Sequence, residues 1–391
     1  MAVLPSALRG ETPRRLDNRS RPPRRRDWDR RSSKRATTCA PARLGRREDL
    51  VYELAVATDV VVRAVGLCQS IAGDADAMAA FAKEDLTPVT VADYAIQALV
   101  EDELSAAGLL TRDVPLIAEE SWSQFDRDSV RDLVDPFRGA AASAGSSLEA
   151  QAAGGDRWWV LDPIDGTRGF VSGDETDMYT IGLALIQDGA PIVGVLGLPN
   201  YPNWDLAKEG TQQHGGLVLT SARGRGTTLV GAGGRGAANM ASTSSSISSS
   251  SSSSVVDGSA TFEDATVLVS RSQASFCARV PLARAFAGRR PRQVVTACCG
   301  SLCKYAAVAL GLASCYVEHP VEGKDALRTW DHAAGVSTVL EAGGKVTDLV
   351  GNDLVFERGE SFTPGGLGVV CSNGVFHDEI VSRLSKELGL R

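Results

Sequence analysis

The stretch Trp158-Trp159-Val160-Leu161-Asp162-Pro163-Ile164-Asp165-Gly166-Thr167 joins an apolar run to two carboxylates three residues apart. The apolar run predicts a strand that ends at Asp162. Pro163 predicts a turn directly after it, so Asp165 falls on the turn and both carboxylates can converge just beyond the sheet. Carboxylate oxygens are ligands that hard divalent cations prefer. The stretch therefore predicts a metal site at the end of a strand.

The residues that follow Asp165 suit an anion. Gly166 allows the backbone to pass close to a ligand, and a helix that begins near Thr167 would point free N–H groups at the same place. A cation and a phosphate would then share one pocket. The alternative is a surface strand-to-helix turn capped by an aspartate.

The composition indicates a globular, intracellular protein. A chain of 391 residues with 43% hydrophobic residues can bury a large core, as one large domain or two. No run of about 18 uncharged apolar residues occurs, and the first thirty residues lack the apolar centre of a signal peptide. The eight cysteines show no paired CxxC spacing with histidines, which argues against zinc and fits a reducing compartment.

The net charge of −7 hides a split between the two ends of the chain. Residues 1–47 hold 15 Arg and Lys against 4 Asp and Glu, which leaves 26 against 44 in the rest. The body is therefore strongly acidic. Because polyphosphates bind basic surfaces, we expect the folded body to bind neither nucleic acid nor a membrane.

Residues 1–47 lack a hydrophobic period and are rich in Arg, Pro and Ser, so they are predicted to be disordered. Three interpretations stay open: a chloroplast or mitochondrial transit peptide, a nucleic-acid-binding tail, or an extension with no role. Arginine and serine favour a transit peptide, whereas Asp17, Asp27 and Asp29 weaken it. Without a transit function the protein would be cytoplasmic.

The first half of the body predicts an α+β metal-binding domain, residues 48–260. Apolar residues recur at helical spacing in 50–72 and 92–107, residues 115–120 read as a strand, and 123–156 as a loop. Residues 178–187 and 191–198 flank Asp188-Gly189, which marks a hairpin. Glycine and then serine dominate 223–260, which predicts a flexible insertion ending at the domain boundary.

The second half, residues 261–391, predicts an α/β substrate domain, because strands and helices alternate there. The predicted strands are 265–270, 293–297, 314–318, 345–347 and 368–371, and the predicted helices are 274–286, 301–313, 331–342 and 375–388.

Four clusters with acidic residues occur in a characteristic order: residues 87–93 (TPVTVAD), 119–121 (EES), 162–167 (DPIDGT) and 330–335 (WDHAAG). With these clusters the chain resembles, over residues 50–388, the lithium-sensitive, magnesium-dependent phosphatases of the inositol monophosphatase superfamily. The resemblance implies an α/β fold with five layers, αβαβα. It is strongest to the 3′(2′),5′-bisphosphate nucleotidases, through residues 87–94, DGTRGF at 165–170, GSLCKY at 300–305 and WDHAA at 330–334.

The resemblance also implies roles for individual residues. A first Mg²⁺ would be held by Glu119, Asp162 and the carbonyl of Ile164. A second would be held by Asp162, Asp165 and Asp331. A third, weaker ion would lie near Glu119. Asp93 and the hydroxyl of Thr167 would steer the attacking water. An acidic residue in the first turn of a helix is the alternative interpretation of Asp93.

The residues implied to contact substrate are Gly166, Thr167, Ser301, Lys304 and Glu318. Ser301 and Lys304 lie one turn apart at a predicted helix start and can face one phosphate; the alternative is an N-cap serine followed by an exposed lysine. Glu318 departs from the pattern, because bisphosphate nucleotidases usually carry an arginine there. A glutamate resembles the inositol monophosphatases and would repel a second phosphate, unless His319 or Arg328 compensates.

The predicted function is Mg²⁺-dependent hydrolysis of the 3′-phosphate of adenosine 3′,5′-bisphosphate, and also of its sulfated form 3′-phosphoadenosine 5′-phosphosulfate, in sulfur assimilation or nucleotide salvage. Its partner would be a small phosphorylated nucleotide. The alternatives are an inositol phosphate phosphatase with the same metals and a catalytically weak nucleotide-sensing protein.

Overall fold

The computed structural model describes residues 50–72, 81–82, 88–123, 125–139, 156–174, 176–204, 215–232, 256–270, 285, 289–297, 300–318, 326–362 and 368–390. Asp49–Arg391 forms one compact unit. The predictions for the tail, the serine tract and most of the helix at 274–286 lie outside the described residues. The division into two domains near residue 260 stays a prediction.

A six-stranded sheet lies in the first half of this unit. Its strands follow chain order: β3 (Leu116–Ala118), β4 (Arg157–Asp165), β5 (Thr180–Gln187), β6 (Ala190–Leu198), β7 (Leu217–Ala222) and β8 (Gly226–Gly231). Only the β3–β4 pair is parallel. The predicted hairpin is confirmed, because Asp188 and Gly189 have φ of 51° and 78°, as a two-residue turn between twisted strands requires.

Two long helices cover one face of this sheet. They are α1 (Val51–Ala72) and α2 (Val91–Ala106), and both were predicted from their apolar spacing. By length and composition α1 is apolar enough to cross a membrane. One face of α1 is nevertheless buried against α2, β6 and β7, as expected of an amphipathic core helix.

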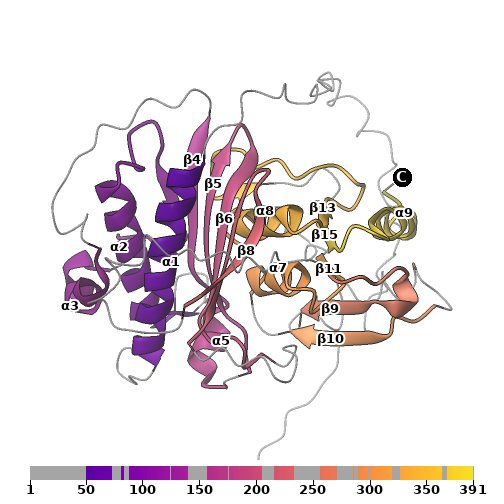
Figure 1. The fold of residues 1–391 in the computed structure, drawn as a ribbon, viewed down its shortest axis with the longest axis horizontal. Helices are drawn as coiled ribbons and strands as arrows, with labels where there is room; N and C mark the ends of the chain where they lie inside the picture. Colours follow the sequence, from indigo (N-terminus) through magenta and orange to yellow (C-terminus); the bar gives the residue numbers. More distant parts are fainter. Residues whose placement is uncertain are drawn as a thin grey trace, which may run out of the picture. The chain divides into compact units, whose positions relative to one another are not determined.

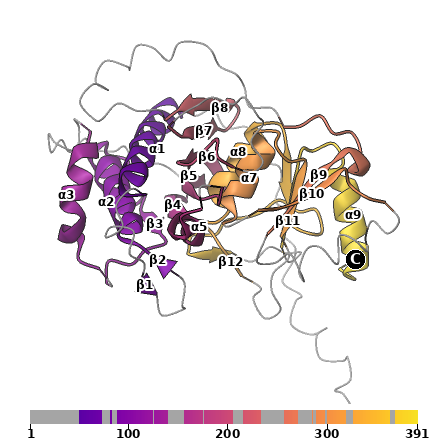
Figure 2. The ribbon, with the colours of Figure 1, turned by 90° about the horizontal axis from the view of Figure 1, so that it is seen from below.

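The second half of the chain adds three further layers. Helices α7 (Leu302–Ala309) and α8 (Ala333–Glu341) lie between the first sheet and a five-stranded sheet, which α9 (His377–Glu387) covers on its far side (Figures 1 and 2). The strands of that sheet run in the order β10 (Gln293–Ala297), β9 (Thr266–Ser270), β11 (Cys315–Glu318), β15 (Val369–Ser372) and β13 (Lys345–Thr347).

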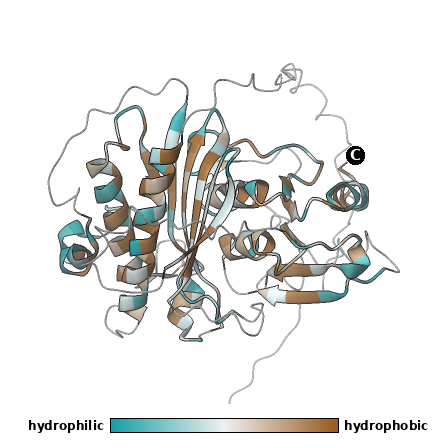
Figure 3. Ribbon diagram, in the orientation of Figure 1, coloured by the Kyte–Doolittle hydropathy of each residue, from teal (hydrophilic) through white to brown (hydrophobic). Residues whose placement is uncertain are grey.

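Three apolar clusters hold the layers together. One lies between α1, α2 and the first sheet, one between the two sheets around α7 and α8, and one between the second sheet and α9. Figure 3 shows hydrophobic residues on the strands and on the helix faces turned toward them. The predicted order αβαβα is confirmed.

Short elements complete the described chain. They are β1 (Phe81–Ala82), β2 (Pro88–Val89), η1 (Arg127–Val130), α3 (Arg131–Val134), η2 (Asp135–Phe137), α5 (Thr167–Ser172), η4 (Phe262–Asp264), β12 (Leu327–Arg328) and β14 (Ser361–Phe362).

Two predictions of irregular structure were wrong. The loop predicted at 123–156 is helical between Arg127 and Phe137, where the Asp126 carboxylate accepts the N–H of Asp128 and starts the first turn. The insertion predicted at 223–260 begins too early, because β8 pairs with β7 along its whole length. The β-branched residues Thr227, Thr228 and Val230 favour a strand in spite of the glycines on either side.

Helix α8 lies against β6 at a glycine. A Cβ at Gly194 would lie 2.6 Å from Cβ of Ser337 and 2.8 Å from the carbonyl oxygen of Ala334. Ser337 and Ser221 share a hydrogen bond at 3.0 Å at the same place, and the Thr227 hydroxyl donates to the carbonyl of Thr338 at 2.7 Å. These contacts set the position of α8 along the sheet.

Gly194→Ala should therefore destabilise the protein, because the backbone carbonyl of Ala334 cannot move aside without shifting α8. We expect a loss of about 1–3 kcal/mol in the free energy of unfolding, measured by urea denaturation. Gly231→Ala is the control, since no atom lies within 4 Å of the Cβ position there. Equal stability of the two variants would contradict the close contact between α8 and β6.

Candidate active site

Asp162 and Asp165 lie on the same face of β4 because the strand contains a bulge. Asp162 pairs with Gly182 and Asp165 with Thr180, so two residues of β4 stand opposite one residue of β5. Ile164 packs in the core on the α1 and α2 side. In a regular strand residues three apart face opposite sides, and the extra residue cancels that alternation. Both carboxylates can thus lie on the side of α7.

The prediction that the strand ends at Asp162 was wrong. Strand β4 continues through Pro163 to Asp165. Pro163 lacks an N–H group, but a bulge leaves an unpaired position that tolerates this. The two carboxylates converge through an irregularity inside the sheet rather than through a turn beyond it.

Asp331 completes an acidic cluster. One carboxylate oxygen each from Asp162, Asp165 and Asp331 lies within 4.8 Å of the others. Glu119 follows β3, and its N–H donates to the carbonyl of Leu161 at 3.2 Å, which places it beside Asp162. The structure thus brings together the four carboxylates predicted from three separate segments of the chain.

Burial makes this cluster electrostatically costly. Asp162 is 1% exposed and Asp165 6%. Loss of solvent raises the pKa of Asp162 well above its ordinary value, and the charges of Glu119, Asp165 and Asp331 raise it further. The pKa of Asp331 is also raised, first by burial and then by Asp165 and Glu119.

The cluster fits a divalent cation. Within the described part of the chain, no N–H or O–H group donates to either oxygen of Asp162. A buried carboxylate without donors costs several kcal/mol unless a proton or a cation neutralises it, on the order of the penalty known for unpaired buried charges. Oxygen ligands of this kind match magnesium or calcium rather than softer metals.

The N-terminus of α7 abuts Asp165. The N–H of Leu302 donates to Oδ2 of Asp165, and a Cβ on Gly300 would lie 2.3 Å from that carboxylate. Burial raises the pKa of Asp165 to about 7, although the charge of Lys304 and the N–H groups of Leu302 and Ser301 act in the opposite direction. Glycine at position 300 is therefore required by the close approach of helix and carboxylate.

Lys304 lies inside the protein. It is 3% exposed, its Nζ donates to the carbonyl of Gly300, and it lies 5.5 Å from the centre of the Tyr316 ring. The alternative of an exposed lysine after an N-cap serine was thus wrong. Direct contact of Lys304 with a substrate stays a prediction.

Ser301 and Glu318 meet at the start of α7. The Ser301 hydroxyl donates to Oε2 of Glu318 at 3.4 Å, and the Tyr316 hydroxyl donates to the same oxygen. The charge of Glu318 contributes to the raised pKa of Asp331, so these two carboxylates lie near each other. Sequence analysis missed Tyr316, although residues two apart on a strand share one face.

Gly166 and Thr167 form the junction between β4 and α5, and their contact with a phosphate stays a prediction. Gly166 has φ 89° and ψ 37°, a left-handed conformation that favours glycine, and α5 begins at Thr167. The Thr167 hydroxyl donates to the carbonyl of Ile164 at 3.0 Å. The metal role of that carbonyl stays a prediction.

Asp93 has a structural role in α2. Its Oδ2 accepts the N–H of Thr90 at 2.8 Å and the Thr90 hydroxyl at 2.6 Å, which forms a capping box. The alternative interpretation of Asp93 as an acid in the first turn of a helix is therefore correct. Its catalytic role beside Thr167 stays a prediction.

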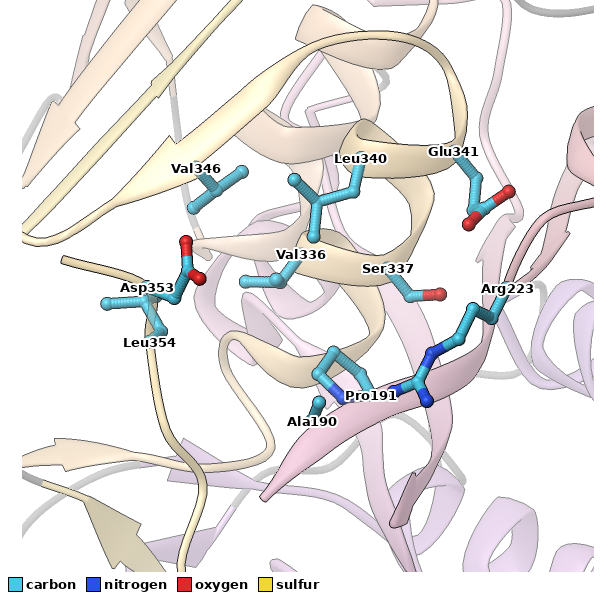
Figure 4. Close-up of a pocket in the computed structure, with 10 residues that line it drawn as sticks. All are labelled: Ala190, Pro191, Arg223, Val336, Ser337, Leu340, Glu341, Val346, Asp353 and Leu354. Carbon is cyan, nitrogen blue, oxygen red and sulfur yellow. The ribbon is translucent and has the colours of Figure 1, made fainter. Parts of the chain in front are cut away.

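A separate cavity of about 250 Å³ lies at the other end of α8 (Figure 4). None of the predicted site residues lines it. Its lining comprises Ala190, Pro191, Arg223, Val336, Ser337, Leu340, Glu341, Val346, Asp353 and Leu354. The acidic cluster, rather than this cavity, gathers the predicted chemistry.

Comparisons with known proteins show the family. The model of the inositol monophosphatase family matches residues 49–388. A protein of Arabidopsis thaliana named putative 3′(2′),5′-bisphosphate nucleotidase, mitochondrial, is 36% identical over 375 residues, covering 85% of this chain and 86% of its own. A 3′(2′),5′-bisphosphate nucleotidase of Dictyostelium discoideum is 30% identical over 330 residues, covering 78% and 88%.

Solved structures share the fold. An inositol monophosphatase of Thermotoga maritima superposes with a TM-score of 0.55 at 21% identity, covering 86% of this chain and 98% of its own. The protein CysQ of Bacteroides thetaiotaomicron, a bacterial member of the inositol monophosphatase family, gives 0.54 at 21% identity, covering 82% and 97%.

The raised pKa of Asp165 predicts how pH changes the stability of the metal-free protein. Between about pH 4 and pH 7 the folded state keeps a proton on Asp165 that the unfolded state has lost, so this carboxyl contributes stability at low pH. The contribution disappears as pH rises through 7. The wild type should therefore lose stability relative to Asp165→Asn over this range, measured by urea denaturation in EDTA.

The comparison with the variant is needed because buried His377 acts in the opposite direction. Burial lowers the pKa of His377 to about 4, so its contribution to stability grows as pH rises. A wild type that gains stability relative to Asp165→Asn between pH 5 and pH 7 would show that Asp165 is ionised in the metal-free protein.

Proposed function

Because this chain belongs to the inositol monophosphatase family, we propose that it is a metal-dependent phosphatase that removes the 3′-phosphate of adenosine 3′,5′-bisphosphate and releases AMP. The names of its relatives support the nucleotide substrate. The observation that carries the proposal is the cluster of Asp162, Asp165 and Asp331, of which the first two are buried. We extend the proposal to 3′-phosphoadenosine 5′-phosphosulfate, which carries the same 3′-phosphate.

We propose Mg²⁺ as the cation, in two or three sites. Glu119, Asp162 and the Ile164 carbonyl would hold one ion, and Asp162, Asp165 and Asp331 another. The Ile164 carbonyl has a second lone pair besides the one that Thr167 uses. Bound there, the cations would polarise the phosphoryl group and neutralise charge on the leaving oxygen.

The chain's own groups would orient the reactants. In the proposal Asp93 and the Thr167 hydroxyl direct a water at the phosphorus, while the N–H groups that follow Gly166 bind the phosphate. The proposed substrate contacts at the start of α7 are the hydroxyl of Ser301 and the carboxylate of Glu318. Lys304 would add positive charge from inside the protein.

A second candidate function is the hydrolysis of inositol phosphates. One observation favours it, because Glu318 is a hydrogen-bond acceptor near Asp331 and suits a sugar hydroxyl better than a second phosphate. The hydrogen bonds from Tyr316 and Ser301 disperse the negative charge of Glu318. They thereby reduce its repulsion of a second phosphate, which supports the nucleotide substrate.

We also propose that residues 1–47 direct the protein to an organelle. The relative from Arabidopsis thaliana carries the word mitochondrial in its name, and the arginine and serine content of the segment suits a transit peptide. A fluorescent protein fused behind residues 1–47 should enter mitochondria or chloroplasts, and a cytoplasmic signal would contradict this.

The two candidate substrates can be compared directly. With saturating Mg²⁺, kcat/KM for adenosine 3′,5′-bisphosphate should exceed that for inositol 1-phosphate, and EDTA should abolish both activities. Millimolar Li⁺ should inhibit, because the chain resembles lithium-sensitive phosphatases. Faster release of phosphate from inositol 1-phosphate would establish the second candidate instead.

Asp162→Asn should abolish turnover and leave the fold intact. The amide removes a charge from the centre of the cluster, and the loss of metal catalysis costs several kcal/mol, on the order of a thousandfold or more in kcat. The temperature of thermal unfolding in EDTA should be unchanged or raised, because the amide replaces a carboxyl whose ionisation burial disfavours. More than about a tenth of wild-type activity would contradict the assignment of Asp162 as the shared ligand.

A further inference from the structure

We propose that Tyr305 is a positioning residue of the metal site, which holds the segment of Asp331 in register with Asp165 through a hydrogen bond to His332. This inference rests on the proposed metal function. The Tyr305 hydroxyl and Nδ1 of His332 lie 2.8 Å apart, and both side chains are buried. His332 follows Asp331 directly in the chain, so whatever fixes its side chain also restrains Asp331.

Tyr305 extends from the helix that binds Asp165. It lies three residues after Leu302, whose N–H donates to the Asp165 carboxylate. Helix α7 therefore contacts Asp165 through its backbone and His332, the neighbour of Asp331, through the side chain of Tyr305. The separation of Asp165 and Asp331 is thereby set within the protein, before any cation binds.

The surroundings fix the ring of Tyr305 as well as its hydroxyl. A Cβ on Gly335 would lie 2.4 Å from Cγ of Tyr305, so the ring lies directly on the first turn of α8. Phe362 packs edge-on against the imidazole of His332, with ring centres 5.5 Å apart. The ring packing alone would leave the rotation of His332 open, and the hydrogen bond selects one orientation.

Either atom can be the donor in this hydrogen bond, according to the tautomer of His332, and both arrangements need the phenol oxygen of Tyr305. A phenylalanine at position 305 would keep the packing and lose only this bond.

The test is Tyr305→Phe in the full chain. Metal binding without substrate is measured by calorimetric titration with Mn²⁺ and Mg²⁺. A lost hydrogen bond of ordinary strength should weaken binding about three- to tenfold. The Mg²⁺ concentration for half-maximal activity should rise by the same factor, whereas kcat at saturating Mg²⁺ should change less than about twofold, because the cation restores the geometry once bound.

Thr347→Val is the matched control. Thr347 and Nε2 of His377 form another buried hydroxyl–imidazole contact, also at 2.8 Å, between β13 and α9. This variant should lose thermal stability to a similar degree and bind metal as the wild type does. If Thr347→Val weakens metal binding as much as Tyr305→Phe, the effect is general destabilisation and the inference is overturned.

A double-mutant cycle with His332→Ala tests whether the effect of Tyr305→Phe on metal binding acts through His332. Replacing Tyr305 should weaken metal binding in the wild type and have no further effect when His332 is already alanine. Additive effects, or a Tyr305→Phe protein that binds metal normally, would overturn the positioning role. A wild type that binds no divalent cation would instead overturn the proposed metal function.

Discussion

The constraint on which the structure depends is the burial of several carboxylates at one point. Asp162 and Asp165 are almost completely enclosed, and the charges of Glu119 and Asp331 add to the cost. Burial of like charges disfavours the folded state unless protons or cations neutralise them. A protein under no functional demand would replace such residues with apolar ones, so their presence is strong support for a cation site.

The architecture around the cluster reduces this cost. Helices α7 and α8 both lie between the two sheets and begin beside the carboxylates, so their positive ends face the negative charges. Glycines make this arrangement possible: Gly300 lets α7 approach Asp165, and Gly194 lets α8 lie close to β6. The dense packing of the middle layers is thus part of the site, because it fixes where both helices start.

The features that could be predicted from the sequence are those whose pattern lies within one segment of the chain. Periodicity within a segment predicted α1, α2, the β5–β6 hairpin and the alternation after residue 261, because each pattern is complete in the sequence. The four acidic segments were found through their likeness to a known family. The bulge in β4 could not be predicted, since a register shift depends on the partner strand as well as on Pro163. The partners of Lys304 and Glu318 depend on packing between elements, which explains why Tyr316 was missed.

The burial of Lys304 affects how the site can distinguish substrates. The buried ammonium group of Lys304 donates to the carbonyl of Gly300, so it would act on a substrate through its charge. Such a charge favours any phosphate at the acidic cluster, whatever the rest of the substrate. Discrimination between a nucleotide and an inositol phosphate requires directed contacts instead. Ser301 and Glu318 share a hydrogen bond at the start of α7, so a substrate that binds either group must compete with the other and with Tyr316. In the proposed site, the preference between substrates would depend on how readily Glu318 exchanges the Ser301 and Tyr316 hydroxyls for those of a substrate.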